Sequence, residues 1–181
     1  PGKRFDSMKK IKIAHIGVTH EHAEGKISTL RRLPEIFEIV GYVNDLEISK
    51  TPRFGSPNLK AYEGLNRITL EEALDYPGLQ AATVEVPNLE LVPMALKCLD
   101  RRIAMHMDKP AGQDLALFKQ LLDGCKAKQI PFQMGFMFRN NPAMLLAKRA
   151  FRAGWLGEIF ELQGSMSHHY GGDAYQDYLR N

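Results

Sequence analysis

A glycine-containing segment near the N-terminus has residue types that could bind a phosphate. Gly17-Val18-Thr19-His20-Glu21-His22 follows a short run of β-branched residues and precedes a helix-like segment. At such a turn, main-chain amides and the helix dipole attract a pyrophosphate, and the usual spacing is G-x-G-x-x-G. This sequence keeps the first glycine but has Thr19 and His22 in place of the other two. We therefore expect Gly17, Val18, Thr19, His20 and His22 to contact a dinucleotide, with the backbone held further from its phosphates.

Two polar residues end the next β-branched run, where an acidic side chain would bind the adenosine ribose. Asn44 and Asp45 lie about 22 residues beyond the last motif position, near the ~20 that the dinucleotide fold predicts. If Asn44 faces the ribose and Asp45 points away, the missing charge would tolerate a 2′-phosphate. Both NAD and NADP therefore stay candidates.

The histidines of this segment are not expected to bind a metal. His20 and His22 are two residues apart, with His15 nearby. Side chains two apart at a helix start diverge, and no local carboxylate–histidine spacing supports zinc. The alternatives are a place beside the cofactor phosphates or an exposed surface.

The elements that must position these residues alternate between strand and helix, which predicts a Rossmann-type doubly wound parallel sheet. Thr69 and Glu72 form a capping box, and Asp114 is placed to cap a helix. The expected strands are 11–17, 37–43, 79–86, 103–107 and 132–138, the expected helices are 21–33, 69–76, 89–100 and 115–128, and 49–66 is expected to be loop.

The pattern changes near residue 138. Asn141 should cap a helix that begins at Pro142 and closes at Gly154, and residues 158–169 alternate like a long half-exposed strand. One strand cannot form an independent fold, so this part is expected to open an α+β domain whose remainder is absent. The expected divisions are a lead-in of residues 1–10 with Met8 as a candidate start, a dinucleotide-binding domain of residues 11–138, and the beginning of a substrate and oligomerisation domain at 139–181.

Four segments carry motifs in a recognisable order. They are Pro87-Asn88, Asp108-Lys109-Pro110-Ala111-Gly112, GFMFRNNP at 135–142 and GWLGEI at 154–159. Together they resemble the Gfo/Idh/MocA oxidoreductase family, which has T-P-N and E-K-P turns, a G-[YF]-x-x-R-x-N-P junction and a G-x-[IL]-G-[ED]-[IV] motif. The resemblance covers residues 10–169. It implies a Rossmann domain with bound NAD or NADP, and hydride transfer at a carbinol carbon of a sugar, polyol or related metabolite.

The resemblance also implies residue roles. Lys109 would be the catalytic lysine near the nicotinamide, as proton donor or hydrogen-bond partner to the substrate hydroxyl. Asp108 replaces the usual glutamate, and the Lys109–Pro110 peptide is expected to be cis. Pro87 and Asn88 would border the nicotinamide ribose, and the cofactor would also lie against Asp108, Lys109 and Pro110.

The substrate would lie against Arg139, Asn141 and the histidine pair His168 and His169, whose side chains must face opposite sides of a strand. The family's later D-x-x-x-H pair would lie beyond residue 181, so this chain is expected to lack a complete site. The resemblance further implies a homo-oligomer, formed through the missing C-terminal sheet. Leu91 stands where relatives often carry histidine.

Composition excludes other classes of partner. The net charge of +3 is too small for a nucleic-acid binder. No stretch approaches 18 apolar residues, so no membrane span is expected. Cys98 and Cys125 fall in helical patterns and should be buried thiols of a cytoplasmic protein.

Two alternatives remain beside a dehydrogenase. One is a lyase or glycosidase that uses tightly bound NAD transiently. The other is a non-enzymatic protein that binds a dinucleotide or sugar as a signal and acts through a protein partner, which the altered glycine motif and Leu91 favour.

Overall fold

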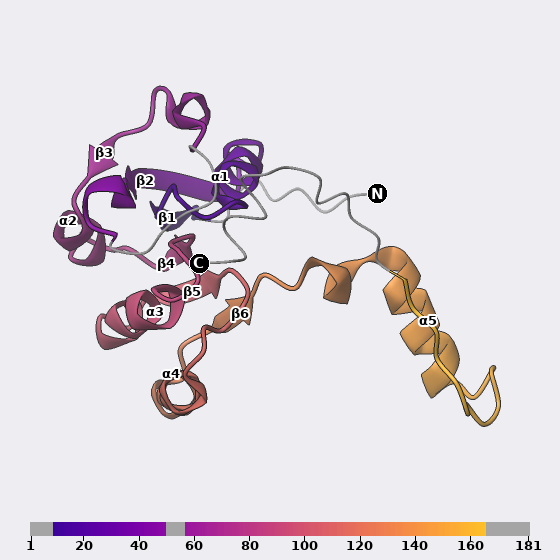
Figure 1. Ribbon diagram of the computed structural model, residues 1–181. Helices are drawn as coiled ribbons and strands as arrows, with labels where there is room; N and C mark the ends of the chain where they lie inside the picture. Colours follow the sequence, from indigo (N-terminus) through magenta and orange to yellow (C-terminus); the bar gives the residue numbers. More distant parts are fainter. Residues whose placement is uncertain (1–8, 50–56, 166–181) are drawn as a thin grey trace, which may run out of the picture. The chain divides into compact units, whose positions relative to one another are not determined.

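The computed structural model describes residues 9–49 and 57–165 of the 181-residue chain. It consists of two compact units, the first ending at Gly135 and the second beginning at Phe136. Figure 1 shows the first unit in indigo through magenta to the orange of β6, and the second unit in lighter orange and yellow. Among the helices of the described ranges, none has the length and apolar character needed to cross a membrane.

The first unit is built on six parallel strands in the order β3-β2-β1-β4-β5-β6. Strand order reverses beside β1, whose neighbours are β2 and β4, as in dinucleotide-binding sheets. The strands are β1 (Ile11–Ile16), β2 (Phe37–Val43), β3 (Arg67–Ile68), β4 (Ala81–Val84), β5 (Ala104–Met107) and β6 (Phe132–Met134). The predicted Rossmann-type sheet is therefore confirmed.

Two buried clusters cover the two faces of the sheet. Ile13 of β1 packs with Ile27 and Leu30 of α1 (Ala23–Arg31), whereas the alternate residues Ala14 and Ile16 belong to the larger cluster. That larger cluster includes side chains from α2 (Leu70–Leu74), α3 (Leu91–Asp100) and α4 (Leu115–Lys128). The helices therefore cover both faces, which explains why the strands are so apolar.

Three helix starts follow the caps that the sequence predicts. Thr69 and Glu72 form the reciprocal capping box at α2, and Asp114 accepts a hydrogen bond from the Leu117 amide at 2.9 Å. In the second unit, Asn141 accepts from the Ala143 amide and Pro142 begins α5 (Pro142–Arg152). Short 3-10 turns occupy Asp45–Glu47 (η1), Leu59–Tyr62 (η2) and Met137–Asn140 (η3).

Three strand predictions differ from the structure. The strand expected at 79–86 is shorter, since β4 covers Ala81–Val84. β6 ends at Met134, although the Gly135 amide still donates to Met107 O of β5 at 2.9 Å. Gly135 then passes against Asp108, where an added Cβ would lie 2.9 Å from Asp108 Oδ1. Residues 158–165 pair with no strand in the described part of the chain, and 166–169 lie outside it. An extended segment needs a hydrogen-bonding partner to become a strand, and polar alternation alone does not supply one.

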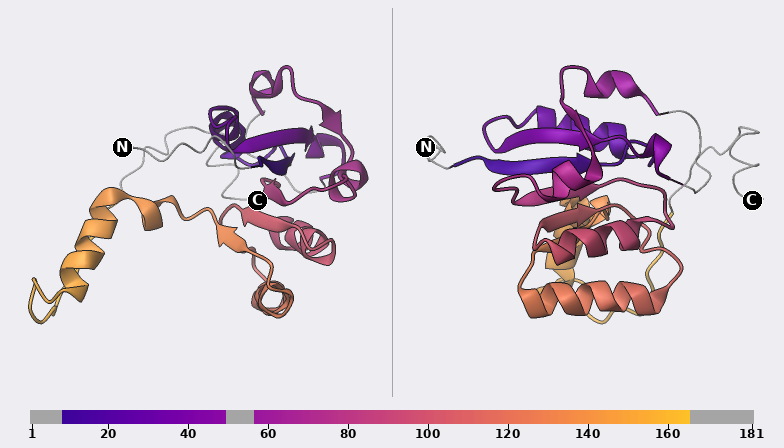
Figure 2. Two further views of the ribbon diagram at one scale, coloured as in Figure 1. Left: turned by 180° about the vertical axis from the view of Figure 1, so that it is seen from behind. Right: turned by 90° about the vertical axis from the view of Figure 1, so that its left-hand side faces the viewer.

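The two cysteines are buried as expected. Cys98 lies in α3 and Cys125 in α4, and these helices lie side by side (Figure 2). Burial raises the pKa of the Cys98 thiol to about 12 and also raises that of Cys125. Both thiols are therefore protonated packing groups between the helices and the sheet.

Candidate functional site

The polar residues that the sequence singled out in the first unit gather at the carboxyl ends of β1, β4 and β5. Ligands of open parallel sheets bind at this edge, where strand order reverses. β1 leads into the segment 17–22, β4 into Glu85–Asn88, and β5 into the turn at 108–112. Residues far apart in the sequence are therefore neighbours here.

Gly17 brings the end of β1 against the end of β4. Its φ is +101°, and an added Cβ would lie 2.4 Å from the main-chain oxygen of Glu85. The Gly17 amide also donates to Val43 O of β2 at 3.0 Å. No larger residue fits this position, so the first glycine of the motif is retained for backbone geometry.

Asp45 is fully buried against the segment that follows Gly17. Its Oδ1 accepts from the Val18 amide at 2.7 Å, and its Oδ2 accepts from the Thr19 hydroxyl. Burial raises the pKa of Asp45, and these hydrogen bonds oppose that rise. Asp45 therefore faces the turn and exposes no surface to which a ribose could bind. The neighbouring Asn44 is half-buried, and its Oδ1 accepts from the Leu46 amide at 3.0 Å.

Other amides of the segment are also paired within the chain. The His20 amide donates to Glu85 O at 3.2 Å, and the His22 amide donates to His20 Nδ1 at 3.2 Å. Together with the contacts of Asp45, these bonds use donors that a glycine-rich turn would offer to a pyrophosphate. The sequence could not reveal this, because Asp45 and Glu85 are distant from the segment along the chain.

His20 and His22 both turn toward Asp108. The His20 ring is buried, its Nε2 lies 3.2 Å from Lys109 O, and its Nδ1 lies 3.8 Å from Asp108 Oδ2. His22 is half-exposed, with Nδ1 3.0 Å from Asp108 Oδ2 and Nε2 3.5 Å from Glu21 Oε1. Burial lowers the pKa of His20, only partly opposed by the charge of Asp108. Among the described residues, the side chains of His20, His22 and Asp108 have donor atoms of the right type, close enough together, to hold a metal ion.

Two buried carboxyl groups face each other in this region. Burial, and then the negative charge of Asp108, raise the pKa of Glu85 well above its usual range. Burial alone would raise the pKa of Asp108 too, but hydrogen bonds from His22 and the Lys109 amide outweigh it and lower that pKa. Lys26 Nζ lies 3.9 Å from Glu85 Oε1 and 3.3 Å from His106 Nε2. Lys26 is thus a cation beside Glu85, and the two coupled carboxyl groups are expected to carry a single negative charge at neutral pH.

Lys109 follows Asp108 in a turn whose Lys109–Pro110 peptide is cis, as expected. Its main chain is fixed at both ends, because its amide donates to Asp108 Oδ1 at 2.6 Å and its carbonyl accepts from His20. Its half-exposed ammonium lies 3.4 Å from Glu21 Oε1. The Lys109 side chain thus extends to the edge of the site from a main chain that is held by hydrogen bonds on both sides.

Pro87 and Asn88 lie beside this turn. Pro87 is buried, and its carbonyl accepts from the Glu90 amide at 2.8 Å before α3 begins. A Cβ on Gly112 would lie 3.7 Å from Asn88 O, so the segment after β4 and the 108–112 turn are in contact.

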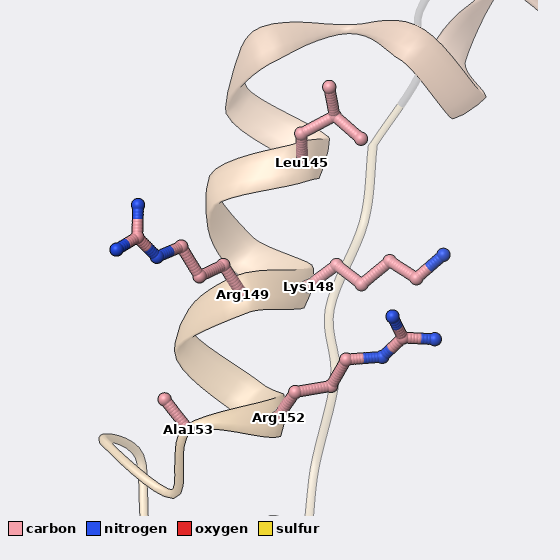
Figure 3. Close-up of a pocket in the computed structure, with 5 residues that line it drawn as sticks. All are labelled: Leu145, Lys148, Arg149, Arg152 and Ala153. Atoms are coloured by element: carbon pink, nitrogen blue, oxygen red, sulfur yellow. The ribbon is translucent and has the colours of Figure 1, made fainter.

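None of the residues expected to contact the substrate belongs to the described part of the first unit. In the second unit, Arg139 lies in η3 with its guanidinium carbon 5.5 Å from the Phe136 ring centroid, and Asn141 caps α5. His168 and His169 lie outside the described residues. A shallow hollow on α5 is lined by Leu145, Lys148, Arg149, Arg152 and Ala153 (Figure 3), all from one helix and its end.

Comparison with known proteins identifies the fold. No protein-family model matches the sequence. Levoglucosan dehydrogenase from Pseudarthrobacter phenanthrenivorans is 24% identical over 127 residues, covering 66% of this chain and 32% of that protein. The structure superposes on myo-inositol 2-dehydrogenase from Lactobacillus plantarum with a TM-score of 0.67 at 18% identity, covering 83% of this chain and 43% of that chain. An NAD-binding protein from Listeria innocua gives a TM-score of 0.66 at 18% identity over 84% of this chain and 42% of that chain.

The structural neighbours are oxidoreductases of the Gfo/Idh/MocA type, so the resemblance read from the sequence motifs is confirmed at the level of the fold. The chain spans about a third of the curated relative and less than half of these solved structures.

The contact of Gly17 predicts a severe effect of adding one methyl group. Gly17→Ala places a Cβ against the backbone of β4 at a positive φ, and should lower the free energy of unfolding by roughly 3 kcal/mol or more. The control Gly25→Ala adds the same group inside α1, where nothing lies within 4 Å. It should raise that free energy by about 0.5–1 kcal/mol. Equal effects in urea denaturation would show that the approach of β1 to β4 is not a constraint.

His15 generates a prediction for pH. Its ring is buried in β1, with Nδ1 2.7 Å from Thr83 Oγ1 and Nε2 3.2 Å from Tyr62 Oη. Burial, opposed by a hydrogen bond with Gly17 and reinforced by Lys26, lowers its pKa from 6.5 to about 3. Between pH 6.5 and pH 3, His15 therefore binds a proton in the unfolded chain but not in the folded chain.

The contribution of His15 to stability is therefore complete above pH 6.5 and is lost as the pH falls toward 3. At pH 5 this loss should reach about 2 kcal/mol. His15→Gln keeps a donor and an acceptor but cannot titrate, so its unfolding free energy should fall less between pH 7 and pH 5. Parallel pH profiles of the two proteins in denaturant titrations would contradict the assignment.

Proposed function

We propose that the protein is an oxidoreductase that binds NAD or NADP at the carboxyl ends of β1, β4 and β5. It would transfer a hydride between this cofactor and a sugar, polyol or related hydroxy compound. The observation that carries the proposal is the Lys109–Pro110 turn, held rigidly beside the point of strand-order reversal. The dehydrogenase names of the relatives support this reading over the non-enzymatic alternative.

The chain fits one end of such a cofactor better than the other. The segment that holds Pro87 and Asn88 contacts the 108–112 turn that holds Lys109, where an added Cβ on Gly112 would lie 3.7 Å from Asn88 O, and these three residues would hold the nicotinamide half. At the pyrophosphate end, the amides of Val18, His20 and His22 are already paired. The half-exposed His22 imidazole at the start of α1 then supplies the attraction for the anion, together with the helix dipole.

The residues of the chain can perform the proton half of the reaction. A bound nicotinamide supplies the hydride donor or acceptor. Removing a hydride from a carbinol leaves a hydroxyl proton to be taken up, and Lys109 is the group placed to hydrogen-bond that oxygen. The bonds from His20 and to Asp108 hold the Lys109 main chain in place, so only its side chain adjusts to the substrate.

The substrate class rests on the relatives and on the second unit. A levoglucosan dehydrogenase and a myo-inositol 2-dehydrogenase act, by their names, on compounds with several hydroxyl groups. We assign residues 139–181 to the beginning of a substrate domain in which Arg139, Asn141, His168 and His169 contact such a compound. The same domain would form a homo-oligomer in the cytoplasm.

The first test is a titration of the protein with NADH and NADPH, followed by nicotinamide fluorescence. Because Asp45 points into the turn and Asn44 is the more exposed of the two, NADPH should bind at least as tightly as NADH. Asn44→Asp introduces a charge near the 2′-phosphate and should weaken NADPH binding by roughly five- to tenfold. NADH binding should change little.

A folded protein that binds neither nucleotide would overturn the proposed function. Equal weakening of both by Asn44→Asp would instead place Asn44 away from the ribose.

Lys109→Ala tests the proton-transfer role. Turnover by the intact protein should fall by about 100- to 10,000-fold, while the dissociation constant of the nucleotide changes little. The matched control is Lys126→Ala, which removes the same charge from an exposed position of α4. Unchanged turnover in Lys109→Ala, measured as the initial rate of NADH or NADPH formation, would make this lysine a structural residue of the turn.

A further inference from the structure

The histidines of the described residues lie close together in the fold. Of the histidines in the described residues, His15, His20, His22 and His106 all lie in β1, β5 or the segment after β1. Two of them, His20 and His22, meet the carboxylate of Asp108, which comes from the end of β5. We call these three residues the His20–His22–Asp108 cluster. One ligand atom from each lies within 4.8 Å of the others.

The separations between these atoms suit a shared ion. Zinc binds nitrogen and oxygen ligands at about 2.0–2.2 Å, so tetrahedral ligands lie about 3.3–3.5 Å apart. Asp108 Oδ2 lies 3.0 Å from His22 Nδ1 and 3.8 Å from His20 Nδ1. The two spacings that include Asp108 bracket the ideal one, and the ligand atoms of the two histidines lie within 4.8 Å of each other. At His20 the ion would replace the amide of His22 on Nδ1.

The opposite edges of the two rings are oriented as they are in metal sites. A ligating histidine usually donates its other ring N–H to a carbonyl or carboxylate, which fixes the ring and leaves the ligating nitrogen free of a proton. His20 Nε2 lies 3.2 Å from Lys109 O, and His22 Nε2 lies 3.5 Å from Glu21 Oε1. Both rings therefore turn Nδ1 toward Asp108. The other carboxylate oxygen of Asp108 accepts from the Lys109 amide.

A buried carboxyl group that accepts no hydrogen bond points independently to a ligand. Glu85 is completely buried, and neither of its carboxyl oxygens has a hydrogen-bond partner among the described residues. Its Oε2 lies 3.8 Å from His20 Nδ1, on the same nitrogen that faces Asp108. Lys26 Nζ lies 3.9 Å from the other oxygen, Oε1, which is beyond hydrogen-bond distance. Burying a carboxyl group without hydrogen bonds costs free energy, which a directly bound cation would recover. Glu85 is thus placed as a fourth ligand.

We propose that His20, His22 and Asp108, with Glu85 as the fourth ligand, form a binding site for a divalent transition-metal ion of the zinc class. Two imidazoles with carboxylates are a donor set for zinc, cobalt or iron, whereas calcium and magnesium prefer oxygen ligands alone. The cluster shares His22 with the proposed nucleotide site, but metal binding can be tested without any cofactor. It was not expected from the sequence, because Asp108 lies 86 residues from His22.

The test is metal binding by the intact protein after purification in chelator. The metal-free protein is incubated with Zn²⁺, dialysed, and analysed for metal by mass spectrometry, and Co²⁺ is added separately to record visible absorption bands. We expect one Zn²⁺ per chain, cobalt bands of a four-coordinate site, and no retention of Ca²⁺ or Mg²⁺. Binding to the folded state should also raise the Tm, and chelator should reverse the rise.

Variants locate the ion. His22→Gln changes a half-exposed side chain and Asp108→Asn removes the shared carboxylate, and each should weaken Zn²⁺ binding at least about 100-fold. The matched control is His15→Gln, because both ring nitrogens of His15 are paired with Thr83 and Tyr62 outside the cluster. This control should bind Zn²⁺ like the original protein. Retention of well under one zinc per chain, or equal affinity in His22→Gln, would overturn the proposal.

Discussion

The approach of Gly17 to the backbone of β4 is the constraint on which the site depends. With a Cβ excluded at 2.4 Å from Glu85 O, the chain leaves β1 directly over the end of β4. Two consequences follow from that one path. Val18 and Thr19 contact Asp45 at the end of β2. His20 and His22 contact Asp108 at the end of β5. A segment of six residues thus connects three strands.

The glycine motif of a dinucleotide fold combines two requirements that this chain separates. One glycine serves the geometry of the strand-to-helix turn, and the others allow phosphate to approach the backbone. Gly17 retains the first role, while Thr19 and His22 replace backbone contacts by side-chain contacts within the protein. The fold is therefore unchanged while the surface presented to a ligand is different. The charge at this edge now depends on histidines, two buried carboxyl groups and Lys26 rather than on free amides.

Most of the fold was predictable because its signals are local. The limits of β2 and α4, the capping box at Thr69 and the cap at Asn141 follow from apolar periodicity and cap chemistry within a few residues. β3 was missed because two residues show no periodicity, and it exists only by pairing with β2. In the site, Gly17 and the Lys109 turn were found from motifs. The roles of Asp45, Glu85 and Asp108 arise from contacts between residues distant along the chain, which no local pattern encodes.

The buried cysteines can report on local unfolding of the first unit. Cys98 is inaccessible and protonated between α3 and the sheet, so a thiol reagent can modify it only after these elements separate. The rate at which Cys98 is modified therefore measures how often α3 separates from the half of the sheet that carries β4 and β5. Any ligand that ties together the ends of these strands with β1 would slow that chemistry, even though neither thiol lies in the site. The reactivity of the buried thiols therefore reports ligand binding at the carboxyl ends of the strands, although the thiols lie outside the site.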